Sequence, residues 1–336
     1  MTSDPQAQHF ALMAQICPQL RRQDSEDFYT WQRRARMRLS ELLGLPFELC
    51  QPELEIEWTR ETDGCRELRI SFCTEAHYRA LAHLLIPRHE APVPVVICLQ
   101  GHSKGMHISL GRPKYPGDEA TISGGDRDFA RQAVARGLAA LVLEQRGFGE
   151  CGGTADGPAC QQPAMAALLL GRTLLGERVW DVMRAVDLIS EDFPELDSRR
   201  IAIMGNSGGG TASIYAAALD TRIAAAMPSC AFCGYEASIG AQLHCVCNYV
   251  PGIMRYFDMG DLAGLIAPRP LVIVNGLHDD IFPIDAARAQ YDVAREYYAA
   301  IHAEEKLRHV VGPEGHRFYA DQGWTAFADC TNWPIS

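Results

Sequence analysis

The 336-residue sequence lacks the features that would direct it to a membrane or to nucleic acid. It has no run of about 18 consecutive apolar residues, which a membrane-spanning helix needs. Its first residues lack the basic, apolar and small-residue order of a secretory signal, so we expect a cytoplasmic protein. Its formal net charge of −11 opposes binding to polyanions. We therefore expect no nucleic acid and no membrane among its partners.

Internal repeats and low-complexity linkers are also missing, which argues against a repeat array or a string of small modules. The hydrophobic content of 47% is enough to build a sizeable buried core. Twelve cysteines are spread along the chain without an export signal, so we expect them to remain thiols rather than form disulfides.

The first part of the chain predicts helices and then antiparallel strands. We expect an N-terminal helical arm over residues 1–46, with its second helix running from Ser25 to Leu43. The remaining domain covers residues 47–336, with a loop or lid insertion at about 229–261. It begins with three strands that form an antiparallel entry to a sheet: Leu54–Trp58, Glu67–Phe72 and Tyr78–Ile86.

From residue 93 onward, apolar strand candidates alternate with helical stretches. The strand candidates are Val93–Leu99, Ala139–Glu144, Arg200–Met204, Ile223–Met227, Pro270–Val274 and Leu307–Val311. The helix candidates are Phe129–Arg136, Val179–Ile189, Thr211–Leu219, Ala286–Tyr298 and Trp324–Cys330. This alternation predicts an α/β fold with a mostly parallel sheet and helices on both faces.

A serine flanked by glycines, Ser207, follows one of these strands directly. The segment Gly205–Gly209 reads Gly-Asn-Ser-Gly-Gly and leads from a strand into a helix. Glycines two residues before and after the serine let strand and helix approach each other, as a serine nucleophile on a sharp turn requires. A phosphate-binding loop is the alternative, but the segment has no Gly-Lys-Ser/Thr ending and no dinucleotide glycine spacing. We therefore predict Ser207 as the nucleophile.

A serine hydroxyl needs a base and an orienting acid, and both follow Ser207 in the chain. His316 follows the last strand candidate within Gly-Pro-Glu-Gly-His-Arg. Two acids, Asp279 and Asp280, follow the strand before it; we prefer Asp279 from its spacing to Gly276 and keep Asp280 as the alternative. The order Ser, Asp, His is the order of the α/β-hydrolase fold.

Further candidates lie around this predicted triad. We expect the backbone amides of Gly208 and His102 to form the oxyanion hole, because one donor follows the nucleophile and the other follows an early strand. His107 and Ser109 either shape a substrate pocket or pack the loops, and Phe232 and Tyr249 are expected to wall the pocket. For two other residues, Arg146 and Trp180, we favour a packing role.

The segment from Ser229 to Tyr249 is rich in metal-ligand residue types. It contains Cys230, Cys233, His244, Cys245 and Cys247. Thiolates and imidazole at such spacings can close a tetrahedral zinc site. Because a Ser-His-Asp site needs no metal, we expect no metal and no cofactor, and we interpret the segment as a packed lid with reduced thiols. A zinc site and a redox-sensitive pair remain the alternatives.

Several of these motifs together resemble one branch of the α/β-hydrolase superfamily, the acetyl xylan esterase-like and dienelactone hydrolase-like enzymes. The motifs are Gln100–His102, Glu144–Gly149, Gly205–Gly209, Ala267–Pro270, Asp279 with Phe282 and Pro283, and Gly315–His316. The resemblance spans roughly residues 78 to 330 and implies an eight-stranded sheet with the site at its C-terminal edge. The oxyanion loop departs from many relatives, which have His-Gly where this chain has Gln-Gly-His.

The sequence thus predicts a serine carboxylic-ester hydrolase that acts through an acyl-enzyme on a small acyl ester, with acetyl on a carbohydrate as the first expectation. Its partner would be a small-molecule ester substrate, and the sequence leaves open whether the chain forms a homo-oligomer. A prolyl-oligopeptidase-type peptidase is the alternative within the enzymes, but the N-terminal region is too short for a propeller. A non-catalytic hydrolase-fold protein and a zinc- or thiol-based sensor are the alternatives outside that class.

Overall fold

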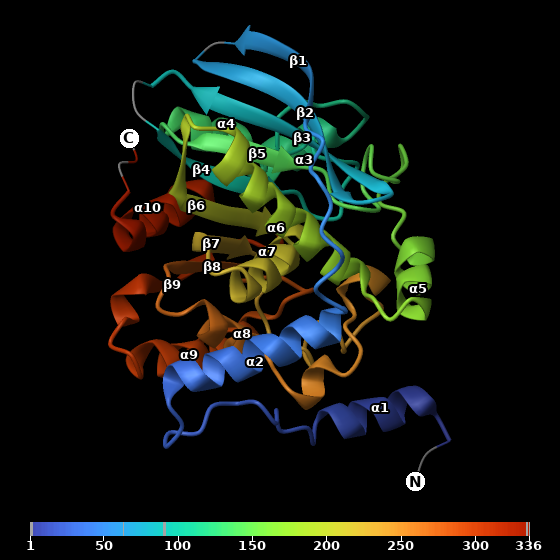
Figure 1. Cartoon of the computed structure of the whole chain (residues 1–336). Helices are drawn as coiled ribbons and strands as arrows, with labels where there is room; N and C mark the ends of the chain where they lie inside the picture. Colours follow the sequence, from blue (N-terminus) through green and yellow to red (C-terminus); the bar gives the residue numbers. More distant parts are fainter. Residues whose placement is uncertain (1–2, 63, 90–91, 334, 336) are drawn as a thin grey trace.

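A nine-stranded sheet runs through the computed structural model, which describes residues 3–62, 64–89, 92–333 and 335 (Figure 1). The strand order is β1-β2-β3-β5-β4-β6-β7-β8-β9. The strands are β1 (Glu55–Thr62), β2 (Cys65–Glu75), β3 (Tyr78–Pro87), β4 (Val93–Leu99), β5 (Ala139–Leu143), β6 (Leu196–Asn206), β7 (Ile223–Ser229), β8 (Leu271–Gly276) and β9 (Leu307–Gly312). All nine ranges predicted as strands overlap these strands.

The sheet is antiparallel at one end and parallel elsewhere. Strands β1, β2, β3 and β5 pair antiparallel, whereas β4 pairs parallel with β5 and β6, and the parallel pairing continues through β7 and β8 to β9. The implied count of eight strands was therefore one too low. The nine ranges predicted one by one from the sequence already include the edge strand β1, in which the side chains from Glu55 to Glu61 are all exposed.

The two faces of the sheet bury different cores, because successive strand residues point to opposite sides. In β4, Val95 and Ile97 belong to the larger core cluster and Val96 to the smaller one. In β6, Ile203 and Met204 divide in the same way. Strands buried on both faces read as continuous apolar runs, which is why the sequence identified them.

Ten α-helices are described around this sheet. They are α1 (Pro5–Met13), α2 (Phe28–Leu43), α3 (Asp118–Gly124), α4 (Phe129–Ala135), α5 (Gln161–Leu169), α6 (Leu174–Asp192), α7 (Gly208–Leu219), α8 (Met259–Ile266), α9 (Ile284–Ala299) and α10 (Ala320–Thr331). Short 3-10 turns lie at η1 (Val246–Asn248), η2 (Ile253–Arg255) and η3 (Glu304–Lys306). Residues of α2, α6, α7 and α8 join the larger core, and residues of α4 and α10 join the smaller one, so both faces are covered as predicted.

Three helices were missed from the sequence: α3, α5 and α8. Helix α8 has only eight residues, all of them buried, so a helical period repeats in it too few times to stand out from the sequence. Helices α3 and α5 are short pieces inside segments that the sequence left as loops. In the part of the chain that the structure describes, no helix is both long and apolar enough to cross a bilayer.

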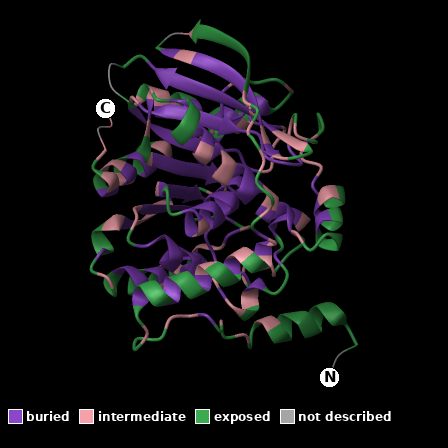
Figure 2. Cartoon of the chain, in the orientation of Figure 1, coloured by how far each residue is buried: buried purple, intermediate pink, exposed green. Residues whose placement is uncertain are grey.

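The two N-terminal helices differ in how they contact the rest of the chain. Helix α1 has no buried residue and lies along the outside of the molecule (Figure 2). Helix α2 buries Trp31, Ala35 and Leu39 completely in the larger core. The indole Nε1 of Trp31 also donates a 2.6 Å hydrogen bond to the carbonyl oxygen of Leu20. Helix α2 is therefore part of the core, whereas α1 is not, and the predicted boundary at residue 46 stays a prediction.

Candidate active site

Five loops meet at the carboxyl edge of the parallel part of the sheet. Because β4, β6, β7, β8 and β9 run in the same direction, the residues that follow them emerge at one edge. His102 follows β4, Ser207 follows β6, Asp279 follows β8 and His316 follows β9. In an open α/β sheet this edge is where ligands bind.

Ser207 lies on a strained turn between β6 and α7. Its backbone has φ 55° and ψ −122°, a conformation that residues with side chains rarely adopt. The turn needs the surrounding glycines: a Cβ at Gly209 would lie 2.2 Å from the carbonyl oxygen of Leu99, and one at Gly205 would lie 2.4 Å from the carbonyl carbon of Gly209. This is the geometry of a nucleophile elbow, and Ser207 is mostly buried in it.

His316 and Asp279 are paired. Nδ1 of the His316 imidazole lies 2.8 Å from Oδ2 of Asp279. The other carboxylate oxygen, Oδ1, accepts hydrogen bonds from the amides of Ile281 at 2.9 Å and Phe282 at 3.1 Å. Burial alone would raise the pKa of Asp279, but the hydrogen bond and charge of His316 and the two amides outweigh it and lower that pKa. The neighbouring Asp280 is exposed.

The loop of His316 reaches the turn of Ser207 through strand β7. The amide of Ser207 donates to the carbonyl oxygen of Ser229 at 2.8 Å. The Ser229 hydroxyl and the Cys230 thiol both donate to the carbonyl oxygen of Arg317, at 3.4 Å and 3.2 Å. On the other side, Arg127 donates from Nη2 to the carbonyl oxygen of His316 at 3.1 Å. Together these bonds fix the His316 loop next to the elbow.

The Cys230 thiol is a second possible type of nucleophile beside Asp279 and His316, but its environment keeps it protonated. A ligand atom of Cys230 lies within 4.8 Å of ligand atoms of both Asp279 and His316. Burial, reinforced by the charge of Asp279, raises the pKa of the Cys230 thiol to about 12. A thiol is a weak nucleophile compared with a thiolate, so the arrangement favours the serine.

The predicted oxyanion loop lies across the elbow. A Cβ at Gly101 would lie 2.8 Å from the carbonyl oxygen of Asn206 and 3.1 Å from Cβ of Ser207. A Cβ at Gly208 would lie 2.6 Å from Cε1 of His102. Gly101 therefore packs against the turn that carries Ser207, and Gly208 packs against His102. The two predicted amide donors lie on these two facing segments. Nε2 of His102 points away from them, to the Cys247 sulfur 3.0 Å away.

A buried carboxylate that the sequence did not single out supports this loop. Glu144 accepts hydrogen bonds from the amide of Met106 at 3.1 Å, from the Gln100 side chain, and from the amide of Glu150 at 3.3 Å. Burial raises the pKa of Glu144 to about 7, although the two amides act in the opposite direction. The residue stands in the Glu144–Gly149 motif, which was noted for resemblance alone.

The predicted pocket residues have contacts of their own. His107 pairs with Asp118 through an Nε2 to Oδ2 distance of 2.8 Å, and Ser109 is fully buried with its carbonyl oxygen bonded to the Ala130 amide. Phe232 is buried, whereas Tyr249 is 42% exposed on the outside of the lid segment. Their contribution to a substrate pocket stays a prediction.

The packing roles favoured for Arg146 and Trp180 are confirmed. Nη2 of Arg146 lies 2.7 Å from Oδ1 of Asp181 and 2.8 Å from Oε1 of Glu75. The indole Nε1 of Trp180 donates to the carbonyl oxygen of Thr74 at 2.7 Å. Both side chains therefore fasten α6 to β2.

The five ligand-type residues of the lid segment do not form one group. The Cys233 thiol donates to the carbonyl oxygen of Pro283 at 3.6 Å, and Cys230 faces Arg317. His244 contacts the Asn248 amide through Nδ1. Cys245 and Cys247 instead face His102, together with Cys160 from a distant part of the sequence. No sequence signal marked Cys160, a single cysteine before α5.

Comparison with known proteins gives one family match. The family model described as acetyl xylan esterase (AXE1) matches residues 124–307, which include Ser207 and Asp279. The Bacillus subtilis protein YtaP, assigned as a hydrolase, is 27% identical over 248 residues, which cover 71% of this chain and 79% of YtaP.

Solved structures with the same fold are also esterases by name. A Bacteroides fragilis protein assigned to the acetyl xylan esterases superposes with a TM-score of 0.79 and 18% identity, covering 93% of this chain and 83% of that one. A glucuronoyl esterase from Solibacter usitatus superposes with a TM-score of 0.69 and 15% identity, covering 95% and 98%. At these identities the likeness establishes the fold, an α/β-hydrolase fold as predicted.

Proposed function

The chain belongs to the acetyl xylan esterase (AXE1) family, and on this premise we propose that it is a serine esterase with Ser207, His316 and Asp279 as its catalytic residues. The family makes it a carbohydrate esterase that acts on acyl esters. The proposed acyl group is small, with acetyl first, and the leaving group is a sugar hydroxyl or a similar alcohol.

The proposed reaction proceeds through an acyl-enzyme. The hydroxyl of Ser207 attacks the ester carbonyl while Nε2 of His316 accepts its proton, and the same imidazolium then protonates the departing alcohol. Water, deprotonated by His316, releases the acid in the second half. Asp279 holds the imidazole through Nδ1 and stabilises its charged form. The amides of Gly208 and His102 stabilise the tetrahedral oxyanion.

The pairing of His316 with Asp279 is the observation that carries this proposal. The carboxylate is buried, ionised and fixed by two backbone amides, so it presents one oxygen to Nδ1, and Nε2 is the nitrogen that remains for proton transfer. A surface histidine with a merely structural role would not need an acid fixed in this way. The strained backbone of Ser207 beside it adds a second mark of a functional site.

The test is hydrolysis of p-nitrophenyl acetate, butyrate and octanoate by the wild type and by Ser207→Ala, with fluorophosphonate labelling of both. We expect acetate to be hydrolysed fastest, and we expect Ser207→Ala to lose labelling and at least about a thousandfold in kcat. Ser190→Ala is the matched control, because its hydroxyl only bonds the carbonyl oxygen of Val186 within α6.

Two outcomes contradict the proposal. One is a Ser207→Ala enzyme with the wild-type rate. The other is a wild type that neither hydrolyses the esters nor reacts with the fluorophosphonate. A wild type that cleaves a proline-containing peptide substrate faster than the acetyl ester would instead favour the peptidase alternative.

A cytoplasmic location and a homo-oligomer complete the proposal. All twelve cysteines are free, which supports a reducing compartment, and cell fractionation tests it. Exposed apolar side chains lie on α1, on α5 and on the lid segment, where Leu243 lines hollows shared with both helices, and they support a subunit contact there: Phe10, Leu12, Met165, Leu169 and Leu243. Light scattering of the whole chain and of Leu169→Asp tests this contact, and equal masses corresponding to one chain would contradict it.

A further inference from the structure

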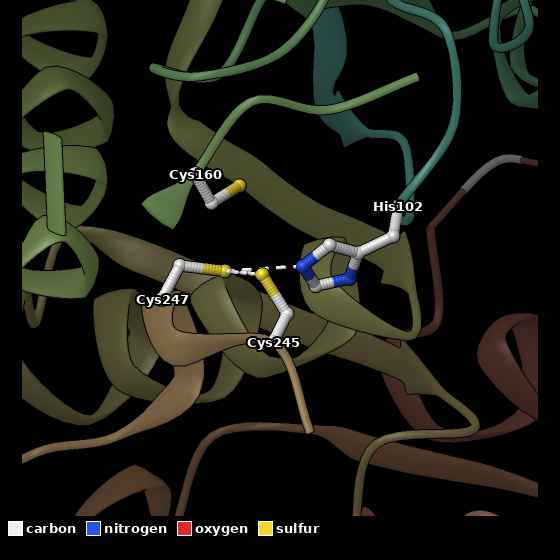
Figure 3. A group of neighbouring side chains, drawn as sticks. All are labelled: His102, Cys160, Cys245 and Cys247. Atoms are coloured by element: carbon white, nitrogen blue, oxygen red, sulfur yellow. Dashed lines mark hydrogen bonds between the residues drawn. The ribbon is translucent and has the colours of Figure 1, made fainter. Parts of the chain in front are cut away.

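A group of three cysteines and one histidine lies outside the proposed triad. One ligand atom from each of His102, Cys160, Cys245 and Cys247 lies within 4.8 Å of all the others. Nε2 of His102 is 3.0 Å from Sγ of Cys247, which is 3.3 Å from Sγ of Cys245. Figure 3 shows the two sulfurs and the ring nitrogen facing one another, with the sulfur of Cys160 directed into the same space.

The four residues come from three separate parts of the chain. His102 stands in the loop after β4 and Cys160 directly before α5; Cys245 directly precedes the turn η1 of the lid segment, and Cys247 lies in it. Cys160 and Cys247 are buried, and the other two are half-buried. Four soft donor atoms brought together in this way form a closed set of ligands, with no carboxylate among them.

The dimensions and ligand types match a tetrahedral zinc ion. With zinc–sulfur bonds of about 2.3 Å, the sulfurs of a tetrahedral site lie about 3.8 Å apart, which the group can reach by small side-chain adjustments. Three cysteines and one histidine are one of the ligand sets of structural zinc sites. Thiolate sulfur also selects against magnesium and calcium, which take oxygen ligands.

The charge of a buried arginine next to the group is an independent argument. Arg178 is 1% exposed, and its Nη2 lies 3.2 Å from Sγ of Cys160. Its Nε and Nη2 also donate to the carbonyl oxygen of Arg146, while Nη1 has no hydrogen-bond partner. A buried cation needs a compensating negative charge nearby. Zinc with three thiolates and a neutral imidazole carries one net negative charge, which balances the guanidinium.

We propose that His102, Cys160, Cys245 and Cys247 bind a structural zinc ion that fastens the lid segment to the loop of His102. The lid turn η1 packs in a small cluster of its own with Phe148, Ala164 and Leu174, apart from both main cores. Few buried side chains therefore hold it, and a metal link adds the missing stability. Three thiols release their protons on binding and no electrons are transferred.

The proposed ion would also position a part of the esterase site. Bound through Nε2, the imidazole of His102 is fixed with its other edge against Gly208, where a Cβ would lie 2.7 Å from Nδ1. The amides of His102 and Gly208 are the proposed oxyanion donors, so this consequence rests on the proposed function. The binding of zinc does not depend on the proposed esterase function, and it is measured separately.

The test measures metal first. Protein expressed in zinc-supplemented medium and purified without chelator is expected to hold one zinc per chain by elemental analysis. Metal-free protein kept reduced and titrated with cobalt(II) alone is expected to give the strong visible bands of tetrahedral cobalt and a sulfur-to-cobalt charge-transfer band. Both measurements use the wild-type chain, so misfolding of a variant cannot affect their result.

Variants then assign the ligands. Cys160→Ser and Cys247→Ser are expected to weaken zinc binding by more than about a hundredfold, since even residues that only support a ligand contribute 10- to 100-fold. Cys233→Ser is the matched control: a buried thiol of the same lid segment whose sulfur faces Pro283. Ser207→Ala is expected to keep the zinc, which separates this site from the nucleophile.

Three outcomes overturn the proposal. The wild type binds neither zinc nor cobalt at one ion per chain; or Cys233→Ser loses the metal as fully as Cys160→Ser; or the chain purifies with a disulfide that links two of Cys160, Cys245 and Cys247, and this disulfide reforms after reduction when the reductant is removed in the presence of zinc. The last outcome would assign the group to the redox-sensitive pair considered from the sequence.

Discussion

Nδ1 of His316 lies 2.8 Å from Oδ2 of Asp279, whereas the side chain of Asp280, one residue further, is exposed. The difference arises from the turn itself, in which the amides of Ile281 and Phe282 both donate to Oδ1 of Asp279. One of two adjacent acids is thus fixed towards the imidazole and the other is left in solvent.

Asp279→Asn and Asp280→Asn form a matched pair. We expect Asp279→Asn to lower kcat for p-nitrophenyl acetate by about a thousandfold or more, because an amide can no longer stabilise the imidazolium or select its tautomer. Asp280→Asn is expected to stay within about threefold of the wild type. Initial rates at saturating substrate measure both effects. A larger loss for Asp280→Asn than for Asp279→Asn would assign Asp280 as the catalytic acid.

Gly209→Ala should disrupt the elbow. The new Cβ would lie 2.2 Å from the carbonyl oxygen of Leu99 and 2.5 Å from that of Gln100, so β4 and α7 must move apart. We expect a loss of stability above about 3 kcal/mol, or a folded protein without fluorophosphonate labelling. Urea unfolding and labelling together measure this.

Gly124→Ala is the control for that substitution. Gly124 lies at the end of α3, and a Cβ there meets nothing within 4 Å. Alanine favours the helix, so this variant is expected to be as stable as the wild type or up to about 1 kcal/mol more stable. Equal effects of the two substitutions would show that the close packing at Gly209 is not what matters.

The buried carboxyl of Glu144 predicts a pH dependence of stability. Its pKa is raised from an ordinary 4.5 to about 7, chiefly by burial, so the folded chain binds the proton more tightly than the unfolded chain. The stability that this group contributes is full below pH 4.5 and is lost as the pH rises to about 7.

The measurement compares urea unfolding of the wild type and of Glu144→Gln at pH 5 and pH 8. Other groups titrate in this range, so the quantity of interest is the difference between the two proteins. Between these pH values the wild type is expected to lose about 2–3 kcal/mol more than Glu144→Gln. Parallel losses in both proteins would mean that Glu144 is ionised at pH 5.

Trp31→Ala tests whether α2 belongs to the core. The indole is fully buried, stacks on Tyr297 with ring centroids 4.6 Å apart, and bonds the carbonyl oxygen of Leu20. Its removal is expected to cost about 3–5 kcal/mol in the free energy of unfolding. Tyr29 lies on the same helix and is 60% exposed, so Tyr29→Ala is expected to cost less than about 0.5 kcal/mol. Similar small losses would restore an independent N-terminal arm.

Much of the fold could be predicted because its signals are local. Strands such as β4 and β8 are buried on both faces and stand out as short apolar runs. Helix α8 gave no such signal because it is short and buried on all sides, whereas the exposed edge strand β1 was predicted in part, as Leu54–Trp58. Periodicity identifies an element only when one of its faces differs from the other.

The sequence by itself determined the order of the elements, the elbow at Ser207 and the succession of Ser, Asp and His candidates, since each depends on neighbours within a few residues. Only the tertiary structure shows that Asp279, and not Asp280, pairs with His316, because two backbone amides orient its carboxylate. It also brought Cys160 and Cys247 to His102 from segments about sixty to 145 residues away. Such contacts depend on how loops cross the sheet edge, and sequence spacing carries no record of that crossing.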